Sequence, residues 1–176
     1  MRALILCGSG RRDGFTAAMC SGAERSLERK GWDVSVFFPA EMEISHCDSC
    51  GGCFQGGECV KLDAMGEVYV AFSGSDLMVL ATPVHFSGES SAIKQAIDRF
   101  DWVWHNDDFP HPKYAVGLLC GGAEHPEFSH ALGVLRAFSK AARMEWAGEL
   151  CLGGTDNGKP GDYEEKACAF IDSLNL

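Results

Sequence analysis

Four cysteines lie within thirteen residues of this chain, at Cys47, Cys50, Cys53 and Cys59, with the spacing C-x2-C-x2-C-x5-C. Glycines and short polar residues separate them, so the segment has too few apolar side chains to form a hydrophobic core. Thiols gathered this densely indicate a metal centre. Three cysteines at two-residue gaps suit a [4Fe–4S] cluster, and the neighbouring glycines let the backbone turn tightly enough to bring in a fourth ligand.

Two other uses of these cysteines remain open. A structural zinc site usually pairs two C-x2-4-C turns across a longer spacer, which makes zinc the alternative metal. Disulfides or unpaired thiols are the third possibility. The chain has nine cysteines in all, and its apolar start runs directly into a Gly-Ser-Gly loop, so we expect no signal peptide. An odd cysteine count in a reducing, cytoplasmic compartment favours metal binding over disulfides.

Composition predicts a single globular domain. The chain has 176 residues, of which 46% are hydrophobic and 23% charged, and this is enough to bury a substantial core. We expect one domain over 1–176, with a compact cysteine-rich insertion at 47–59. The net charge of −10 argues against nucleic acid as a partner. No apolar run has the length of a membrane span.

Apolar runs of strand length alternate with segments of helical period. Strands are expected at 3–7, 33–38, 76–81, 114–120 and 149–152, and helices at 16–30, 65–72, 93–100, 127–144 and beyond Asp162. In the helix at 93–100 we expect Lys94, Gln95, Asp98 and Arg99 to face outward. The alternation predicts an α/β fold, a single-domain doubly wound five-stranded parallel sheet of flavodoxin-like order 2-1-3-4-5.

The loop from Gly8 to Thr16 joins the first strand to the first helix. In a doubly wound sheet this is where an anion meets backbone N–H groups and a helix dipole. Ser9 and Thr16 add hydroxyl donors, and Arg11 or Arg12 supplies a cation, so a phosphate monoester is the expected ligand. A dinucleotide fingerprint is rejected because its third glycine position holds an aspartate, and a Walker loop is absent. An ordinary Gly/Ser turn is the alternative.

The segment 81–91 follows the most buried predicted strand. The carboxyl ends of the first and third strands flank the ligand crevice in this fold class. Pro83 stiffens the exit from the strand, and His85, Phe86 and the small residues after them are suited to line a flat aromatic ligand. Backbone N–H groups there can donate to the ring of a flavin.

In this order, the motifs resemble the iron–sulfur flavoproteins, a branch of the NAD(P)H-dependent FMN reductases with a flavodoxin-like fold. They are Gly-Ser-x-Arg-x-x-Gly-x-Thr, the four-cysteine motif, Ala-Thr-Pro-Val-x-Phe and Ser-Ala-x-Lys-x-x-Ile-Asp-Arg. The resemblance is strong to about Arg99 and looser beyond. It implies FMN, a [4Fe–4S] cluster on the cysteine motif, and assembly as dimers or tetramers. Gly10 replaces a proline common in relatives, and His85 a tyrosine.

The resemblance also implies the residues of each site. The FMN phosphate would bind at Ser9, Arg11 and Thr16, the ring at 82–88, and a further flavin contact would come from Gly121 and Gly122. The complete set of expected cofactor-binding residues is Ser9, Arg11, Arg12, Asp13, Gly14, Phe15, Thr16, Thr82, Pro83, Val84, His85, Phe86, Ser87, Gly88, Gly121 and Gly122. The expected metal ligands are Cys47, Cys50, Cys53 and Cys59.

These expectations describe an FMN-dependent oxidoreductase with a cluster. It would pass electrons between a ferredoxin-like or NAD(P)H donor and a small acceptor, because flavin carries one or two electrons and a cluster carries one. Since the cysteine segment follows the second strand, we expect the cluster and the flavin to lie at the same edge of the sheet. The alternatives are an NAD(P)H:FMN or quinone reductase with structural or zinc-binding cysteines, and a flavodoxin-like carrier.

Overall fold

The computed structural model describes residues 1–57, 59–106 and 108–176. Its strands are β1 (Arg2–Cys7), β2 (Asp33–Phe37), β3 (Leu77–His85), β4 (Gly88–Glu89), β5 (Tyr114–Cys120) and β6 (Glu145–Leu152). Its helices are α1 (Phe15–Arg29), α2 (Cys53–Gly56), α3 (Met65–Gly74), α4 (Ser91–Asp98), α5 (Ser129–Ala141) and α6 (Pro160–Ser173), with short 3-10 turns η1 (Pro39–Glu41) and η2 (Asp101–His105).

The α/β flavodoxin-like class is confirmed, but the sheet differs from the five-stranded prediction. It has six strands in the order β2-β1-β3-β5-β6, with β4 paired to β3 outside this path. The added strand is only two residues long and pairs antiparallel with the end of β3. The predicted order 2-1-3-4-5 is therefore corrected, because the fourth strand along the chain is β4, which lies outside the parallel path. When β4 is left out, the five parallel strands lie side by side in the order second, first, third, fourth and fifth along the chain.

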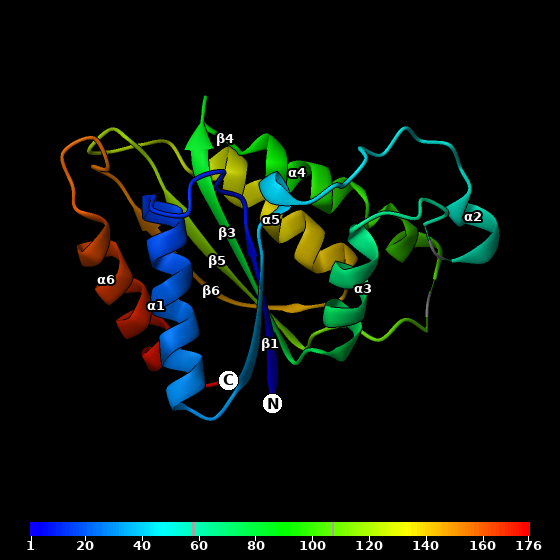
Figure 1. Ribbon diagram of the computed structural model, residues 1–176, viewed down its shortest axis with the longest axis horizontal. Helices are drawn as coiled ribbons and strands as arrows, with labels where there is room; N and C mark the ends of the chain where they lie inside the picture. Colours follow the sequence, from blue (N-terminus) through cyan, green and yellow to red (C-terminus); the bar gives the residue numbers. More distant parts are fainter. Residues whose placement is uncertain (58, 107) are drawn as a thin grey trace.

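Helices cover both faces of this sheet. Figure 1 shows α1 and α6 on one side and α3, α4 and α5 on the other. The pleat of β1 explains the two layers, because Ala3 and Ile5 belong to the core under α1 and α6, whereas Leu4 and Leu6 belong to the core under α3 and α4. All four are at most 1% exposed. The near-continuous apolar sequence of this strand thus follows from burial on both faces.

Strand β3 is longer than expected. The predicted strand ended at Ala81, because the proline that follows at position 83 has no N–H to donate to a neighbouring strand and usually ends a strand. In the structure β3 continues to His85, and a tight turn at Phe86 and Ser87 leads into β4. Both turn residues have positive φ, 51° and 64°, as a two-residue hairpin of this kind requires. The expected loop at 82–88 is therefore mostly hairpin.

A membrane-spanning helix requires a certain length and hydropathy. Among residues 1–57, 59–106 and 108–176, no helix is both long enough and apolar enough to cross a bilayer.

Candidate functional sites

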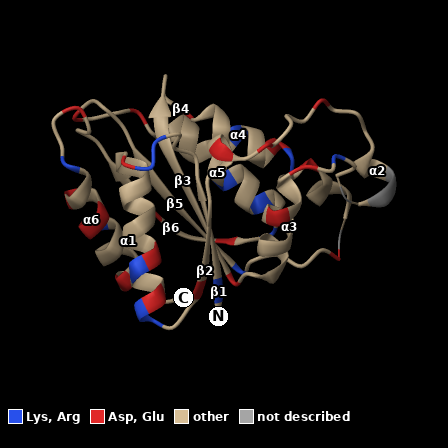
Figure 2. Ribbon diagram, in the orientation of Figure 1, with Lys and Arg blue, Asp and Glu red and all other residues tan. Residues whose placement is uncertain are grey.

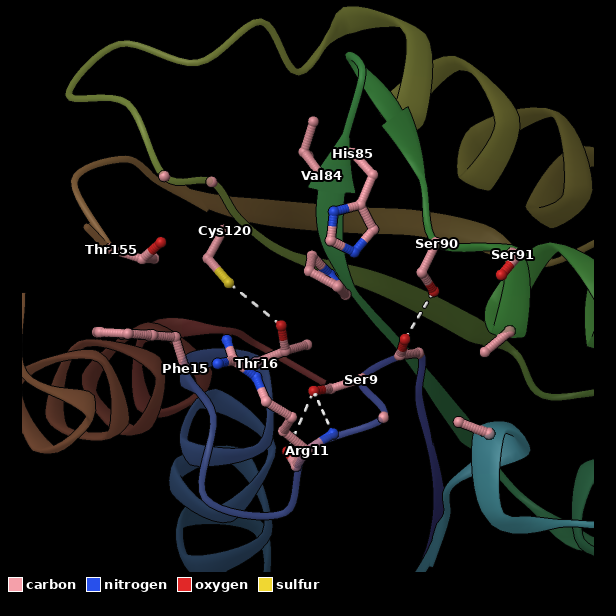
Figure 3. A pocket seen from close by; sticks show the side chains of 17 residues that line it. Ser9, Arg11, Phe15, Thr16, Val84, His85, Ser90, Ser91, Cys120 and Thr155 are labelled. Atoms are coloured by element: carbon pink, nitrogen blue, oxygen red, sulfur yellow. Dashed lines mark hydrogen bonds between the residues drawn. The ribbon is translucent and has the colours of Figure 1, made fainter.

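A pocket of about 360 Å³ opens at the carboxyl ends of the parallel strands. It lies where β1, β3 and β5 end, as the switch-point rule predicts for this fold class. Figure 3 shows the side chains around it. Its volume is within the usual range for small-molecule and cofactor sites. The lining residues are Gly8, Ser9, Gly10, Arg11, Phe15, Thr16, Ala40, Pro83, Val84, His85, Ser90, Ser91, Ala92, Cys120, Gly121, Gly122 and Thr155.

One wall of the pocket is the amino-terminal end of α1. Gly14 is the N-cap, no side chain caps the helix, and its first turn holds no acidic residue. The first N–H groups of a helix have no partner within it, so this end attracts an anion. The loop before it is shaped by Ser9, whose Oγ accepts from the Arg11 N–H and donates to the Arg11 carbonyl, both at 3.1 Å.

The two adjacent arginines of this loop have different roles. Arg11 lines the pocket and forms no ion pair with any described residue. Arg12 turns away, with its Nη2 2.7 Å from a carboxylate oxygen of Glu41 and its guanidinium 3.7 Å from the centre of the Phe38 ring. Figure 2 shows this pair of arginines as a basic segment between β1 and α1. Arg12 was predicted to bind the cofactor, but its contacts are with Glu41 and Phe38 and it does not line the pocket.

Six other predicted residues also lie outside the pocket lining. Asp13 is exposed and Gly14 supports the helix start. Thr82 is fully buried, with its Oγ1 donating to the Pro83 carbonyl and accepting from the Ser90 N–H. The hairpin tip carries the others away from the pocket lining: Phe86, Ser87 and Gly88.

Ser90 joins the loops that follow β1 and β3. Its Oγ donates to the Gly8 carbonyl at 2.6 Å and accepts from the Ile93 N–H, which caps α4. Thr82 fixes the Ser90 backbone in turn. Sequence reasoning missed Ser90 as a site residue. Its signal was available, because a serine three residues before the apolar helical pattern begins at Ile93 is a typical N-cap.

The far wall comes from the loops after β5 and β6. Gly121 accepts a hydrogen bond from the Thr155 N–H at 3.1 Å, and Gly122 accepts one from the Asp156 N–H at 3.3 Å. These bonds bring Thr155 to the pocket lining. Cys120, which was not among the predicted site residues, lies at the end of β5 with its Sγ 3.2 Å from the Thr16 hydroxyl. Burial raises the pKa of this thiol.

A methyl group at Gly8 should disturb this pocket. A Cβ there would lie 2.6 Å from the Ser90 Oγ and 2.9 Å from the Ile93 Cβ, so Gly8→Ala must displace one loop. We expect a stability loss of about 1–3 kcal/mol, typical of overpacking, and weaker flavin binding by fluorescence titration. Gly10→Ala is the matched control, since its Cβ would meet only Ala40 at 3.7 Å. Equal affinities for the two variants would contradict this packing argument.

A second, smaller cavity of about 110 Å³ is lined by all four cysteines of the motif. Cys47 and Cys50 come from the segment after η1, Cys53 begins α2, and Cys59 precedes α3. The turns use positive φ at Ser49, Gly51 and Gly57. The other lining residues are Asp48, Ser49, Gly51, Phe54, Val60, Lys61, Asp98, Arg99, Asp101 and Trp102.

The chemistry of this donor set suits a metal centre. All nine cysteines of the chain are unpaired, and the four of the motif are at least partly exposed. They surround a cavity, but within the described ranges no three ligating side chains converge closely enough to hold one metal ion.

A buried ion pair between Arg99 and Asp63 holds the two ends of the cysteine segment together. The Arg99 Nη1 donates to Asp63 at 2.6 Å and to the Ser45 carbonyl at 2.8 Å, and its Nη2 donates to Asp63 at 3.1 Å and to the Lys61 carbonyl at 3.3 Å. Asp63 also accepts from the Ser45 N–H. Arg99 thus ties together the two ends of the loop 46–60. The prediction that it faces outward is wrong, because α4 ends at Asp98 and Arg99 is 1% exposed.

The Asp63 carboxylate gives this ion pair a pH dependence. Burial alone would raise the pKa of Asp63, but hydrogen bonds from Arg99 and from the Ser45 and Met65 N–H groups lower it from 3.8 to about 2. The unfolded chain therefore binds more protons between about pH 4 and 2, and stability falls as the pH drops through this window. We expect a loss of about 2 kcal/mol, measured by urea denaturation, that is absent in Asp63→Asn. The same acid slope in both proteins would contradict it.

The two sites are separate. The pocket and the cysteine cavity share no lining residue, and α4 spans between them, with Ser91 at the pocket and Asp98 at the cavity. Seven residue steps of a helix cover about 10 Å. Figure 1 shows the cysteine segment and α2 at one end of the long axis, beyond α3. The expectation that both sites lie at one edge of the sheet stays a prediction, since the linings show only that the pocket lies at the amino-terminal end of α4 and the cysteine cavity at its carboxyl-terminal end.

Comparison with known proteins identifies the family. The model for the NADPH-dependent FMN reductases matches residues 1–146. An iron–sulfur flavoprotein from Archaeoglobus fulgidus is 34% identical over 98% of this chain and 78% of its own length. The chain belongs to the NADPH-dependent FMN reductase family. It is accordingly a flavin-dependent oxidoreductase, and the resemblance to iron–sulfur flavoproteins is confirmed. This chain spans between 50% and 78% of the length of the curated relatives it matches.

Solved structures of other proteins agree on the fold. RosB with bound 8-demethyl-8-formylriboflavin-5'-phosphate has a TM-score of 0.77 at 19% identity, covering 99% of this chain and 77% of RosB. An NAD(P)H:quinone oxidoreductase from Methanothermobacter marburgensis has a TM-score of 0.76 at 16% identity, covering 100% of this chain and 96% of that protein. At such identities the likeness concerns the fold alone.

Proposed function

We propose that this member of the family binds FMN in the strand-end pocket. The phosphate would lie at the uncapped end of α1, beside Arg11 and the hydroxyls of Ser9 and Thr16. The ring would lie between Pro83–His85 and Gly121–Gly122. The observation that carries the proposal is that one pocket joins a free helix N-terminus, an arginine without an ion pair among the described residues and the ends of three strands.

We further propose that the cysteine cavity holds a [4Fe–4S] cluster bound by Cys47, Cys50, Cys53 and Cys59. Their position around a common cavity supports this, as does the similarity to proteins named iron–sulfur flavoproteins. Cysteine must be deprotonated to bind metal. In the metal-free chain, burial and the Asp101 carboxylate raise the pKa of Cys53, so cluster assembly would release protons.

The two cofactors together suggest an electron-transfer function. When bound, FMN supplies two-electron or one-electron chemistry and a cluster supplies one-electron chemistry. The protein would accept electrons from NAD(P)H or a ferredoxin-like donor and pass them to a small acceptor. The residues named above would bind and orient the flavin, with no acid–base side chain required. We also propose a homodimer or homotetramer.

Anaerobic stopped-flow reduction tests the function. NADPH, NADH and reduced ferredoxin are mixed separately with the FMN-loaded protein, and flavin bleaching is followed together with the absorbance of the cluster. We expect at least one donor to bleach bound flavin faster than it bleaches free FMN. If none does, the electron-transfer proposal is wrong. Bleaching by nicotinamide in a protein without iron would instead favour a reductase with structural or zinc-binding cysteines.

A further inference from the structure

Two buried N–H donors beside the cysteine cavity have no hydrogen-bond partner among the described residues. They are the Nε of Arg99 and the Nε1 of Trp102. Both residues are 1% exposed, and both line the cavity formed by the four cysteines. Buried indole and guanidinium N–H groups nearly always find an acceptor. Two such donors at one cavity indicate that the acceptor belongs to whatever fills it.

Of the three guanidinium nitrogens of Arg99, only Nε can donate a hydrogen bond into the cavity. Its two terminal nitrogens are occupied by Asp63 and by the Ser45 and Lys61 carbonyls, which leaves Nε. Cys59, a proposed sulfur ligand of the cluster, lines the same cavity as Arg99.

Trp102 is held in position by ring packing. Its indole meets the Phe109 ring edge-on at 3.9 Å and the Tyr69 ring edge-on at 5.6 Å. The Tyr69 hydroxyl donates to the Arg99 carbonyl at 2.7 Å and does not accept from the indole N–H, which has no partner among the described residues. Aromatic contacts fix the plane of the indole, so removing its N–H need not move the ring.

The other charged groups around the cavity increase the effect that these two N–H donors would have on the reduction of a bound centre. Lys61, its other cation, is engaged with Asp48 at 3.1 Å and with the His46 carbonyl at 2.7 Å. Asp98 and Asp101 also line the cavity. These carboxylates oppose the addition of an electron to a centre held by thiolates, whereas N–H donors favour it.

We propose that Trp102 and Arg99 donate N–H···S hydrogen bonds to the sulfur atoms of the cluster and thereby raise its reduction potential. This inference rests on the proposed [4Fe–4S] site. Hydrogen bonds to the sulfurs are one of the principal determinants of cluster potential, and they strengthen as negative charge accumulates on reduction. Trp102 and Arg99 are thus positioning and tuning residues that act through the cysteine ligands.

The test is the midpoint potential of the cluster in Trp102→Phe, measured by anaerobic EPR-monitored redox titration. Phenylalanine keeps an aromatic ring and removes the N–H. We expect the reduction equilibrium constant to fall about tenfold, which is 59 mV for a one-electron couple, with unchanged iron and sulfide content. Trp104→Phe is the matched control, because Trp104 lies on the same turn but is 68% exposed and absent from the cavity lining.

Each outcome has a separate meaning. A cluster in both proteins with equal potentials would overturn this inference and leave the proposed function intact. A wild-type protein without iron and sulfide would overturn the proposed function itself. Where Trp102→Phe fails to fold, Arg99→Lys provides the second measurement, since lysine keeps the charge and removes Nε. A lowered potential in that variant with retained sulfide supports the proposal, and an unchanged one contradicts it.

Discussion

Replacing Arg99 by methionine should destabilise the protein by about 3–5 kcal/mol, the usual cost of removing one partner of a buried ion pair. The Asp63 carboxylate, with a side chain only 13% exposed, would keep its charge without its cation. The Ser45 and Lys61 carbonyls would also lose their donor, so both ends of the cysteine segment would be released. We therefore expect a lower urea midpoint together with loss of bound iron.

Lys94→Met provides the control for Arg99→Met. Lys94 also forms an ion pair, with Asp98 on the same helix, but both side chains are more than 40% exposed. Exposed pairs of this kind contribute little, so this variant should unfold at nearly the wild-type denaturant concentration. A cost below about 1 kcal/mol for Arg99→Met would show that the buried pair does not hold the segment.

Replacing Arg11 by glutamine should weaken FMN binding about tenfold to a hundredfold. Hydrogen bonds to a charged group contribute about 1.5–3 kcal/mol, and about 1.4 kcal/mol corresponds to a factor of ten in affinity. Arg11 lines the pocket beside the α1 N-terminus and has no competing carboxylate among the described residues. Its guanidinium is therefore available to the phosphate. Fluorescence titration of the apoprotein with FMN measures the effect.

Two controls make the Arg11 experiment specific. Arg12→Gln removes the neighbouring charge, but Arg12 is paired with Glu41 outside the pocket, so FMN affinity should stay near the wild-type value. Riboflavin lacks the phosphate, and its affinity should be the same in wild type and in Arg11→Gln. Equal losses of FMN affinity in the two arginine variants would mean that overall charge, and not contact with the phosphate, governs binding.

Much of the fold could be predicted because it depends on local pattern. The strand at 114–120 coincides with β5, and the other predicted elements overlap observed ones, since apolar runs and helical periods record burial directly. The errors arose where an element ends. Pro83 masked the continuation of β3 because proline lacks an N–H, and the two-residue β4 is too short to leave a pattern.

The candidate sites were less predictable because they depend on contacts between distant segments. Arg99 lies one residue past the end of α4, so helical periodicity no longer describes the direction of its side chain. Its partner Asp63 is 36 residues away. The different directions of Arg11 and Arg12 depend on Glu41, and Thr155 reaches the pocket through the Gly121 carbonyl. None of these contacts has a periodic signature.

The most direct measurement of the central claim is cofactor analysis of the anaerobically purified and reconstituted protein. Flavin, iron, acid-labile sulfide and zinc are determined on one sample, with its absorption and EPR spectra. The account predicts one FMN and about four irons and four sulfides per chain, with flavin retained and iron lost in a Cys50→Ser variant. Stoichiometric zinc without sulfide, or a chain that does not bind FMN when it is supplied, would contradict it.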